Sequence, residues 1–153
     1  MADSERLVLD SNQIAQILPH RYPFALVDRI TDGEVGSWAR GQLCVSVMSP
    51  VFCGHFPQYH VLPGVLTVEA LAQTAAVAVL AAPENRGKLG FFAQIKDARF
   101  KRQVRPGDVL ELEARIVRTR GSFAFVEGTA RVDGKVATTA ELTLALGSGE
   151  NGQ

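Results

Sequence analysis

The chain has 153 residues, of which 46% are apolar and 21% charged, as is ordinary for a soluble globular chain. Its 16 basic and 16 acidic residues cancel, so no overall field favours nucleic acid or an anionic membrane surface as a partner. Two cysteines are too few for a disulfide framework, and the polar, acidic N-terminus does not resemble a secretory signal, so we expect a cytoplasmic location.

The first half of the chain predicts one short helix, two strands and a long loop. Ser11 would cap a helix that runs to Leu18 and ends at Pro19. The stretch "FALVDRITD" is typical of a strand, with Asp32 and Gly33 as turn residues before a second strand around residues 37–47. The stretch "SPVFCGHFPQYHVLPG" then contains three prolines and two glycines. Irregular loops of this length inside a domain are more often functional than idle.

The segment from Gly64 to Ala82 predicts a helix that is apolar on all sides. Such a helix must be covered all round. It also carries Glu69, and an acid near the centre of a bilayer is rare and costly. The segment therefore predicts a buried core helix and no membrane span.

Four strand-like runs follow, separated by "RPGD", "TRGS" and "VDGK". The pair Asp133-Gly134 in the last of these is a strong hairpin signal. Apolar and polar residues alternate in "VLELEARIVR" and "ATTAELTLAL", which indicates strands with one buried face. Short connections make consecutive strands antiparallel neighbours. The runs span residues 89–100, 109–119, 123–132 and 135–146.

These elements predict an α+β fold in which an antiparallel sheet wraps around a long central helix. One sheet cannot enclose a helix completely, so we expect a second copy to cover the remaining helix surface in a homodimer. Residues 1–147 form the single domain of this prediction, and residues 148–153 form a disordered tail.

Two residues near the start of the helix are candidates for chemistry. An unpaired buried charge is expensive, so Glu69 either keeps its proton, performs chemistry or pairs with an arginine. His55 suits a base near neutral pH, although a histidine in such a loop can also be satisfied by a backbone carbonyl. Cys53, His55 and His60 lack the spacing of paired zinc ligands, so we expect no metal.

Four segments carry a resemblance to a known family: "ILPHRYPFALVDRI", "GHFP…VLPGVLTVEALAQ", "ARFKRQVRPGD" and "VDGKVATTAELTLAL". In this order they resemble the (3R)-hydroxyacyl-acyl-carrier-protein dehydratases of the FabZ type, over residues 14–146. The resemblance implies the dimeric hot-dog fold and elimination of water from 3-hydroxyacyl thioesters to give trans-2-enoyl products. It further implies an acyl carrier protein as partner, no cofactor, and a place in fatty acid or specialised polyketide or polyene biosynthesis.

The family's functional residues can be carried over by position. The catalytic histidine falls on His55 and the catalytic acid on Glu69, with Gln73 supporting the acid. The backbone amides of Gly64 and Val65, at the helix start, would hold the thioester carbonyl. In the family the histidine and the acid of one site come from opposite subunits. Candidates for the acyl tunnel are Phe56, Pro63, Phe91 and Phe92, and the acidic carrier would dock on Lys96, Arg99, Lys101, Arg102 and Arg105.

The chain departs from the family pattern beside His55. Gln58, Tyr59 and His60 replace the usual glycine–x–proline, and Gln103 stands where proline is common. A glutamine at a glycine position with positive φ would strain the same turn, so we expect a reshaped loop and an unusual acyl chain. His20 and Arg21 are expected to have a structural or tunnel-lining role.

Two alternatives remain open from the sequence. A hot-dog thioesterase would use a helix-start amide and a carboxylate in a similar way. A partner subunit of a hetero-oligomeric dehydratase would bind acyl groups without turnover, although both His55 and Glu69 are present. Assembly of dimers into hexamers is also compatible with the resemblance.

Overall fold

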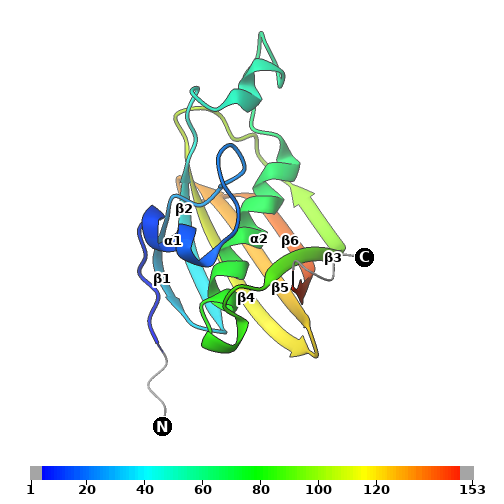
Figure 1. Cartoon of the computed structure of the whole chain (residues 1–153). Coiled ribbons are helices and arrows are strands. Elements are labelled where there is room, and N and C mark those ends of the chain that lie inside the picture. Colours follow the sequence, from blue (N-terminus) through cyan, green and yellow to red (C-terminus); the bar gives the residue numbers. More distant parts are fainter. Residues whose placement is uncertain (1–4, 149–153) are drawn as a thin grey trace.

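A six-stranded antiparallel sheet in the order β1-β2-β4-β5-β6-β3 forms the body of the protein, with one long helix lying across it (Figure 1). The computed structural model describes residues 5–148, so residues 149–153 of the predicted tail lie outside the described part. This architecture confirms the predicted α+β fold. The helices are α1 (Ser11–Ile17) and α2 (Gly64–Leu80), with 3₁₀ turns η1 (Pro50–Cys53) and η2 (Pro83–Asn85). The strands are β1 (Arg29–Glu34), β2 (Trp38–Cys44), β3 (Leu89–Phe100), β4 (Val109–Arg120), β5 (Phe123–Val132) and β6 (Lys135–Gly147).

The alternation of the last strands places one face of the sheet against α2. Leu110, Leu112 and Ala114 of β4 are buried, while the residues between them are exposed or half-buried. The predicted β5–β6 hairpin is confirmed. Asp133 and Gly134 have φ of 51° and 78°, as a two-residue turn with both central residues left-handed requires.

Helix α2 is covered by its own chain from Ala70 onwards. Every residue from Ala70 to Leu80 is buried, and α2 packs against β2, β4, β5, β6 and α1. The N-terminal segment and the curved sheet therefore cover this part of the helix without a second copy, whereas Val65 in its first turn is 71% exposed. Within residues 5–148, no helix is long and apolar enough to cross a membrane.

Unpartnered apolar surface lies instead on β3, at one edge of the sheet. β3 pairs only with β6, so its other side presents free backbone groups. Four large apolar side chains on this strand are between 42% and 53% exposed: Phe91, Phe92, Ile95 and Phe100. An exposed apolar edge of this kind is typical of an interaction surface.

The N-terminal helix is capped by a different residue from the predicted one. Asp10 is the N-cap, and its side chain accepts from the amide of Gln13, whose own side chain accepts from the Asp10 amide. This capping box makes Ser11 the first helical residue. The helix ends at Ile17, one residue before the predicted end.

The first strand begins later and extends further than predicted. β1 starts at Arg29, and Asp32 and Gly33 lie within it, so their assignment to a turn is wrong. The register shifts between Ile30 and Asp32, and the Asp32 carboxylate accepts from the Gly33 amide at 2.9 Å, which gives a turn-like local geometry inside a strand. The chain reverses at Gly36, where φ is 79°. The amide of Gly36 donates to Ala78 of α2.

Replacement of Leu71 tests the importance of the helix–sheet contact. Leu71 is fully buried, and its side chain packs on Gly128 of β5. We expect Leu71→Ala to lower the free energy of unfolding by about 2–5 kcal/mol, because it removes buried methyl groups and leaves a cavity. Urea unfolding at fixed protein concentration measures the loss. Val8→Ala, at an exposed valine, is the control, and an equal effect of both variants would contradict the assignment.

Candidate active site

His55 follows η1 in the loop that leads to α2, and hydrogen bonds hold its backbone and its ring. Its amide donates to the carbonyl of Val51 at 3.1 Å. Its Nδ1 lies 2.7 Å from the carbonyl oxygen of Val61. Because a carbonyl can only accept, Nδ1 carries a hydrogen, and in the neutral imidazole the lone pair is then on Nε2. The imidazole is thus oriented as a base with Nε2 as the accepting atom.

The start of α2 lies in the same cavity as His55. This cavity has a volume of about 300 Å³, and both His55 and Gly64 line it. The first amides of α2, at Gly64 and Val65, have no partner inside the helix and lie at the positive end of its dipole. They can therefore donate to a carbonyl oxygen that carries developing negative charge.

Gly64 also packs closely against the Phe100 ring. A Cβ at this position would lie 2.7 Å from Cδ1 of the Phe100 ring, closer than real contacts allow. The carbonyl of Gly64 accepts from the hydroxyl of Thr67 at 2.6 Å, and that hydroxyl also contacts Thr138 of β6 at 2.8 Å. The first turn of α2 is thereby tied to the sheet, which fixes the direction of its free amides.

Glu69 lies one turn further along α2 and is held by Gln73. Its side chain is only 14% exposed, and its Oε1 accepts from Nε2 of Gln73 at 3.1 Å. Gln73 is itself buried. Its Nε2 also donates to the carbonyl of Phe24, and its Oε1 accepts from the amide of Leu26, both at 2.9 Å. One carboxamide therefore joins the acid to the loop before β1.

His20 is the neighbour of Glu69 that sequence reasoning assigned to a structural or tunnel-lining role. Its Nε2 lies 3.6 Å from Oε1 of Glu69, an ion pair whenever His20 is protonated and Glu69 ionised. Among the described residues, its Nδ1 is a buried polar atom without a hydrogen-bond partner. Arg21 next to it donates to the carbonyls of Ala15 and Leu18 at the end of α1, so its role is structural. The sequence motif that contains His20 could be identified from the sequence. Its contact with Glu69 could not, because the two residues are far apart in the chain.

The two candidate catalytic residues lie in different cavities of one chain. The cavity of His55 and Gly64 shares no lining residue with the smaller one, of about 30 Å³, that Glu69, Gln73 and His20 line. Each cavity holds one part of the chemistry that the sequence predicted for a single site. A single site that contains both residues would therefore require either a large rearrangement or a second chain.

Of the four tunnel candidates, one lines either of these two cavities. Phe92 lines the cavity of Glu69, and Phe56 stacks on His55 with ring centroids 4.1 Å apart. Pro63 is the N-cap of α2, and Phe91 is half exposed on β3. All four thus lie beside one candidate residue or on the exposed edge.

The predicted docking cations also differ in their surroundings. Lys96 and Arg99 each pair with a carboxylate of the chain, Glu141 at 3.5 Å and Asp97 at 3.2 Å. By contrast, Lys101 and Arg102 line the cavity of His55. The cations best placed to meet an acidic partner at the site are therefore Lys101 and Arg102. Arg105 packs over the ring of Tyr59.

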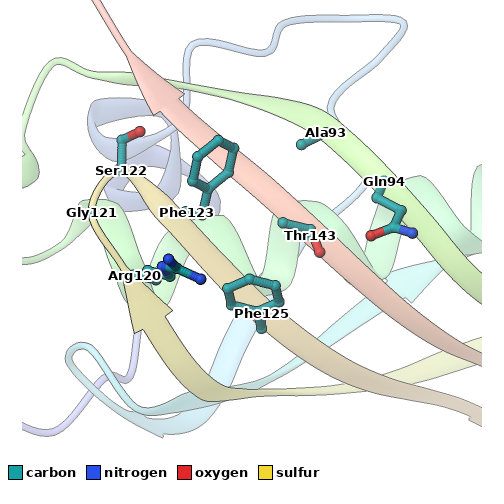
Figure 2. A pocket seen from close by; sticks show the side chains of 8 residues that line it. All are labelled: Ala93, Gln94, Arg120, Gly121, Ser122, Phe123, Phe125 and Thr143. Carbon is teal, nitrogen blue, oxygen red and sulfur yellow. The ribbon is translucent and has the colours of Figure 1, made fainter.

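A larger groove, of about 880 Å³, lies away from these residues (Figure 2). Its walls come from β3, β5 and β6 and from the β4–β5 turn, and include Phe123, Phe125 and Thr143. Because Ala124 and Val126 between and beyond these phenylalanines are buried, the groove is on the face of the sheet opposite α2. It contains none of the predicted site residues.

Within residues 5–148, no three His, Cys, Asp or Glu side chains are grouped to hold a metal ion.

Comparisons with known proteins agree with this description. A family model described as a FabA-like domain matches residues 18–141. The 3-hydroxyacyl-[acyl-carrier-protein] dehydratase FabZ of Bacillus subtilis is 57% identical over 140 residues, which cover 92% of this chain and 99% of the relative.

Two solved structures share the fold at low sequence identity. The dehydratase heterocomplex ApeI:P from Xenorhabdus doucetiae has a TM-score of 0.75 and 22% identity, over 90% of this chain and 92% of that one. A hot-dog-like protein from Thermanaerovibrio acidaminovorans has a TM-score of 0.60 and 16% identity, over 76% and 84%. The sheet with its central helix is thus a hot-dog fold. The chain belongs to the FabA-like family and, within it, to the FabZ-type dehydratases.

Replacement of Gln73 tests the network that holds Glu69. Gln73→Leu leaves the Leu26 amide and the Phe24 carbonyl without their partner, and each buried group left unpaired costs about 1–3 kcal/mol. We expect a lower free energy of unfolding by urea together with reduced turnover. Gln16→Leu, at an exposed glutamine of α1, is the control. Wild-type stability of Gln73→Leu would exclude the network as an anchor.

Proposed function

We propose that His55 and Glu69 carry out the dehydration of 3-hydroxyacyl groups bound to acyl carrier protein. The chain is a 3-hydroxyacyl-[acyl-carrier-protein] dehydratase of fatty acid biosynthesis, a hydro-lyase, in accord with its 57% identity to FabZ over nearly the whole length. The observation that carries the roles is the environment of His55. Its Nδ1 is bound to the Val61 carbonyl, so Nε2 is free as a base in the cavity where α2 begins.

The proposed reaction needs three groups around the acyl thioester. The amides of Gly64 and Val65 donate to the thioester oxygen, where charge develops. Nε2 of His55 takes the proton from Cα, and the electron pair of that C–H bond forms the Cα–Cβ double bond. The Cβ–O bond breaks, and the hydroxyl leaves as water after it receives a proton from Glu69. The products are the trans-2-enoyl thioester and water, and no electron acceptor is required.

We further propose that each site is built from two chains. In one chain, Glu69 and His55 line separate cavities, which supports a site whose acid comes from the second chain. The exposed apolar edge of β3 supplies a surface on which a second copy could extend the sheet. Phe92 of this strand lines the cavity of Glu69, so pairing along β3 would bring a partner close to that acid. We propose a homodimer as the assembly. The molar mass of the assembly in solution would distinguish it from a hexamer or a heterodimer.

The proposed compartment is the cytoplasm. Cys44 and Cys53 are both exposed and unpaired, which suits a reducing environment.

Membership of the dehydratase family favours elimination over thioester hydrolysis. The presence of both His55 and Glu69 argues against an inert partner subunit. The single-domain boundary at residue 147 stays a prediction.

Single and mixed variants test the shared site. We expect His55→Ala and Glu69→Ala each to lower kcat by about 10²–10⁴-fold, since each removes a proton-transfer group. The two inactive variants, unfolded and refolded together, should regain about a quarter of the wild-type rate, because half of randomly paired dimers are mixed and each keeps one intact site. Loss of water from the acyl carrier substrate, followed by mass spectrometry, measures turnover.

The control for this experiment is each inactive variant refolded alone. Both should remain dimers by light scattering and stay inactive. High activity of either single variant would refute its catalytic role. Absence of any recovery, in a sample where mixed dimers are detected, would show that one chain supplies both groups.

Charge reversal tests the docking surface. We expect Lys101→Glu and Arg102→Glu to raise KM severalfold for a 3-hydroxyacyl group on the acidic carrier, because both cations border the His55 cavity. The effect should shrink as salt is added. The same acyl group on a small thiol should show no such change. Lys88→Glu, in the turn before β3, is the control, and an equal effect of this variant would contradict the assignment.

A further inference from the structure

Few residues of the loop that carries His55 are buried. In Figure 1 the segment between β2 and α2 projects beyond the end of the sheet. From His55 to Val61 every residue is exposed or half-buried, and Leu62 is the first buried one. Buried apolar area therefore cannot hold the tip of this loop, and its position depends on polar and aromatic contacts.

Backbone hydrogen bonds within the loop connect Tyr59 to the neighbour of His55. The amide of Phe56 donates to the carbonyl of Tyr59 at 2.9 Å, and the amide of Tyr59 donates back to Phe56 at 3.0 Å. The ring of Phe56 stacks on the imidazole of His55. A displacement of Tyr59 is therefore transmitted to the ring against which His55 rests.

The side chain of Tyr59 joins this loop to a segment 44 residues further along the chain. Its hydroxyl donates to Oε1 of Gln103 at 2.7 Å, and the Arg105 guanidinium lies 4.5 Å from the centroid of its ring. The backbone of Arg105 is held in turn, because its amide donates to the Asp108 carboxylate at 2.8 Å. Gln103 lines the same cavity as His55.

Tyr59 and Gln103 are two of the positions at which the chain departs from the family pattern, and the fold brings them into contact. The backbone contact between the same two segments, from the Leu62 amide to the Val104 carbonyl, lies behind the loop rather than at its tip. Tyr59 thus anchors the tip to residues 101–105, while the neighbouring His60 packs its ring 5.6 Å from that of the buried Phe52 within the same loop.

We propose that Tyr59 and Gln103 form a latch, with Arg105 stacked on it, that holds the His55 loop against residues 101–105 and sets the orientation of the imidazole. Both are positioning residues, because they act through Phe56 and the loop backbone and not on the acyl group. The inference rests on the proposed role of His55 and deepens it. It also places the latch on the segment that carries the docking cations Lys101 and Arg102.

Removal of either half of the latch tests the proposal. Tyr59→Phe keeps the ring and its contact with Arg105 but loses the hydroxyl, and Gln103→Met loses the acceptor. With a 3-hydroxyacyl N-acetylcysteamine thioester as substrate, which avoids carrier docking, we expect kcat to fall about three- to tenfold in each, the scale of one lost hydrogen bond. KM should not change. The double variant should be no slower than either single variant, because both remove the same contact.

Gln103→Glu is the conservative control, since its carboxylate still accepts from the Tyr59 hydroxyl and should keep kcat near the wild-type value. Gln16→Met controls for the loss of a surface carboxamide. The unfolding midpoint of every variant is measured alongside, and the two single variants provide independent tests should one fail to fold.

Three results would overturn the latch: wild-type kcat in Tyr59→Phe or Gln103→Met, additive losses in the double variant, or a loss that appears in KM alone. These results are distinguishable from failure of the proposed function. If His55→Ala is inactive while Tyr59→Phe is fully active, the role of His55 stands and the latch fails. If His55→Ala is active, the catalytic role fails irrespective of Tyr59.

Discussion

The structure depends on the packing of one apolar helix against the inner face of one curved sheet. Burial of a large aliphatic side chain stabilises the folded state by about 1.5–3 kcal/mol, and every residue of α2 from Ala70 to Leu80 is buried. This contact positions the chemistry as well. The helix begins at Gly64, where free amides face a cavity, and it carries Glu69 a little over one turn later. Any movement of the helix in its groove would displace both groups together.

Polar residues on this helix are acceptable only because each has a partner. Gln73 uses its amide nitrogen and its oxygen to bind the loop before β1 and still supports Glu69. Thr67 binds Gly64 and Thr138, which ties the helix start to β6. A buried polar group without a partner would cost about 1–3 kcal/mol, so these bonds restrict the helix to one register against the sheet and the N-terminal segment. The geometry of the proposed site and the specificity of the fold thus rely on the same hydrogen bonds.

His55 illustrates a different way to position a group with a proposed catalytic role. Glu69 lies on a rigid helix, whereas His55 lies on an exposed loop that projects beyond the sheet. The ring is oriented by the Val61 carbonyl and supported by Phe56, and the loop is linked to the segment after β3 through Tyr59. A division between a helix-borne acid and a loop-borne base fits a site completed by two chains, since each chain presents its two groups in separate cavities.

The sequence by itself determined the elements whose signals are local. The all-round apolar composition of residues 64–82, the alternation in the last strands and the Asp133-Gly134 turn each follow from nearest neighbours and helix or strand periodicity. The structure has all three, although the helix ends at Leu80. Only the tertiary structure decided which distant polar groups meet. The approach of His20 to Glu69 and the bond from Tyr59 to Gln103 join segments far apart in the chain. Periodicity predicts which face of an element is buried, but partners across the fold are set by how the buried faces pack, and that information is not present in any single stretch of residues.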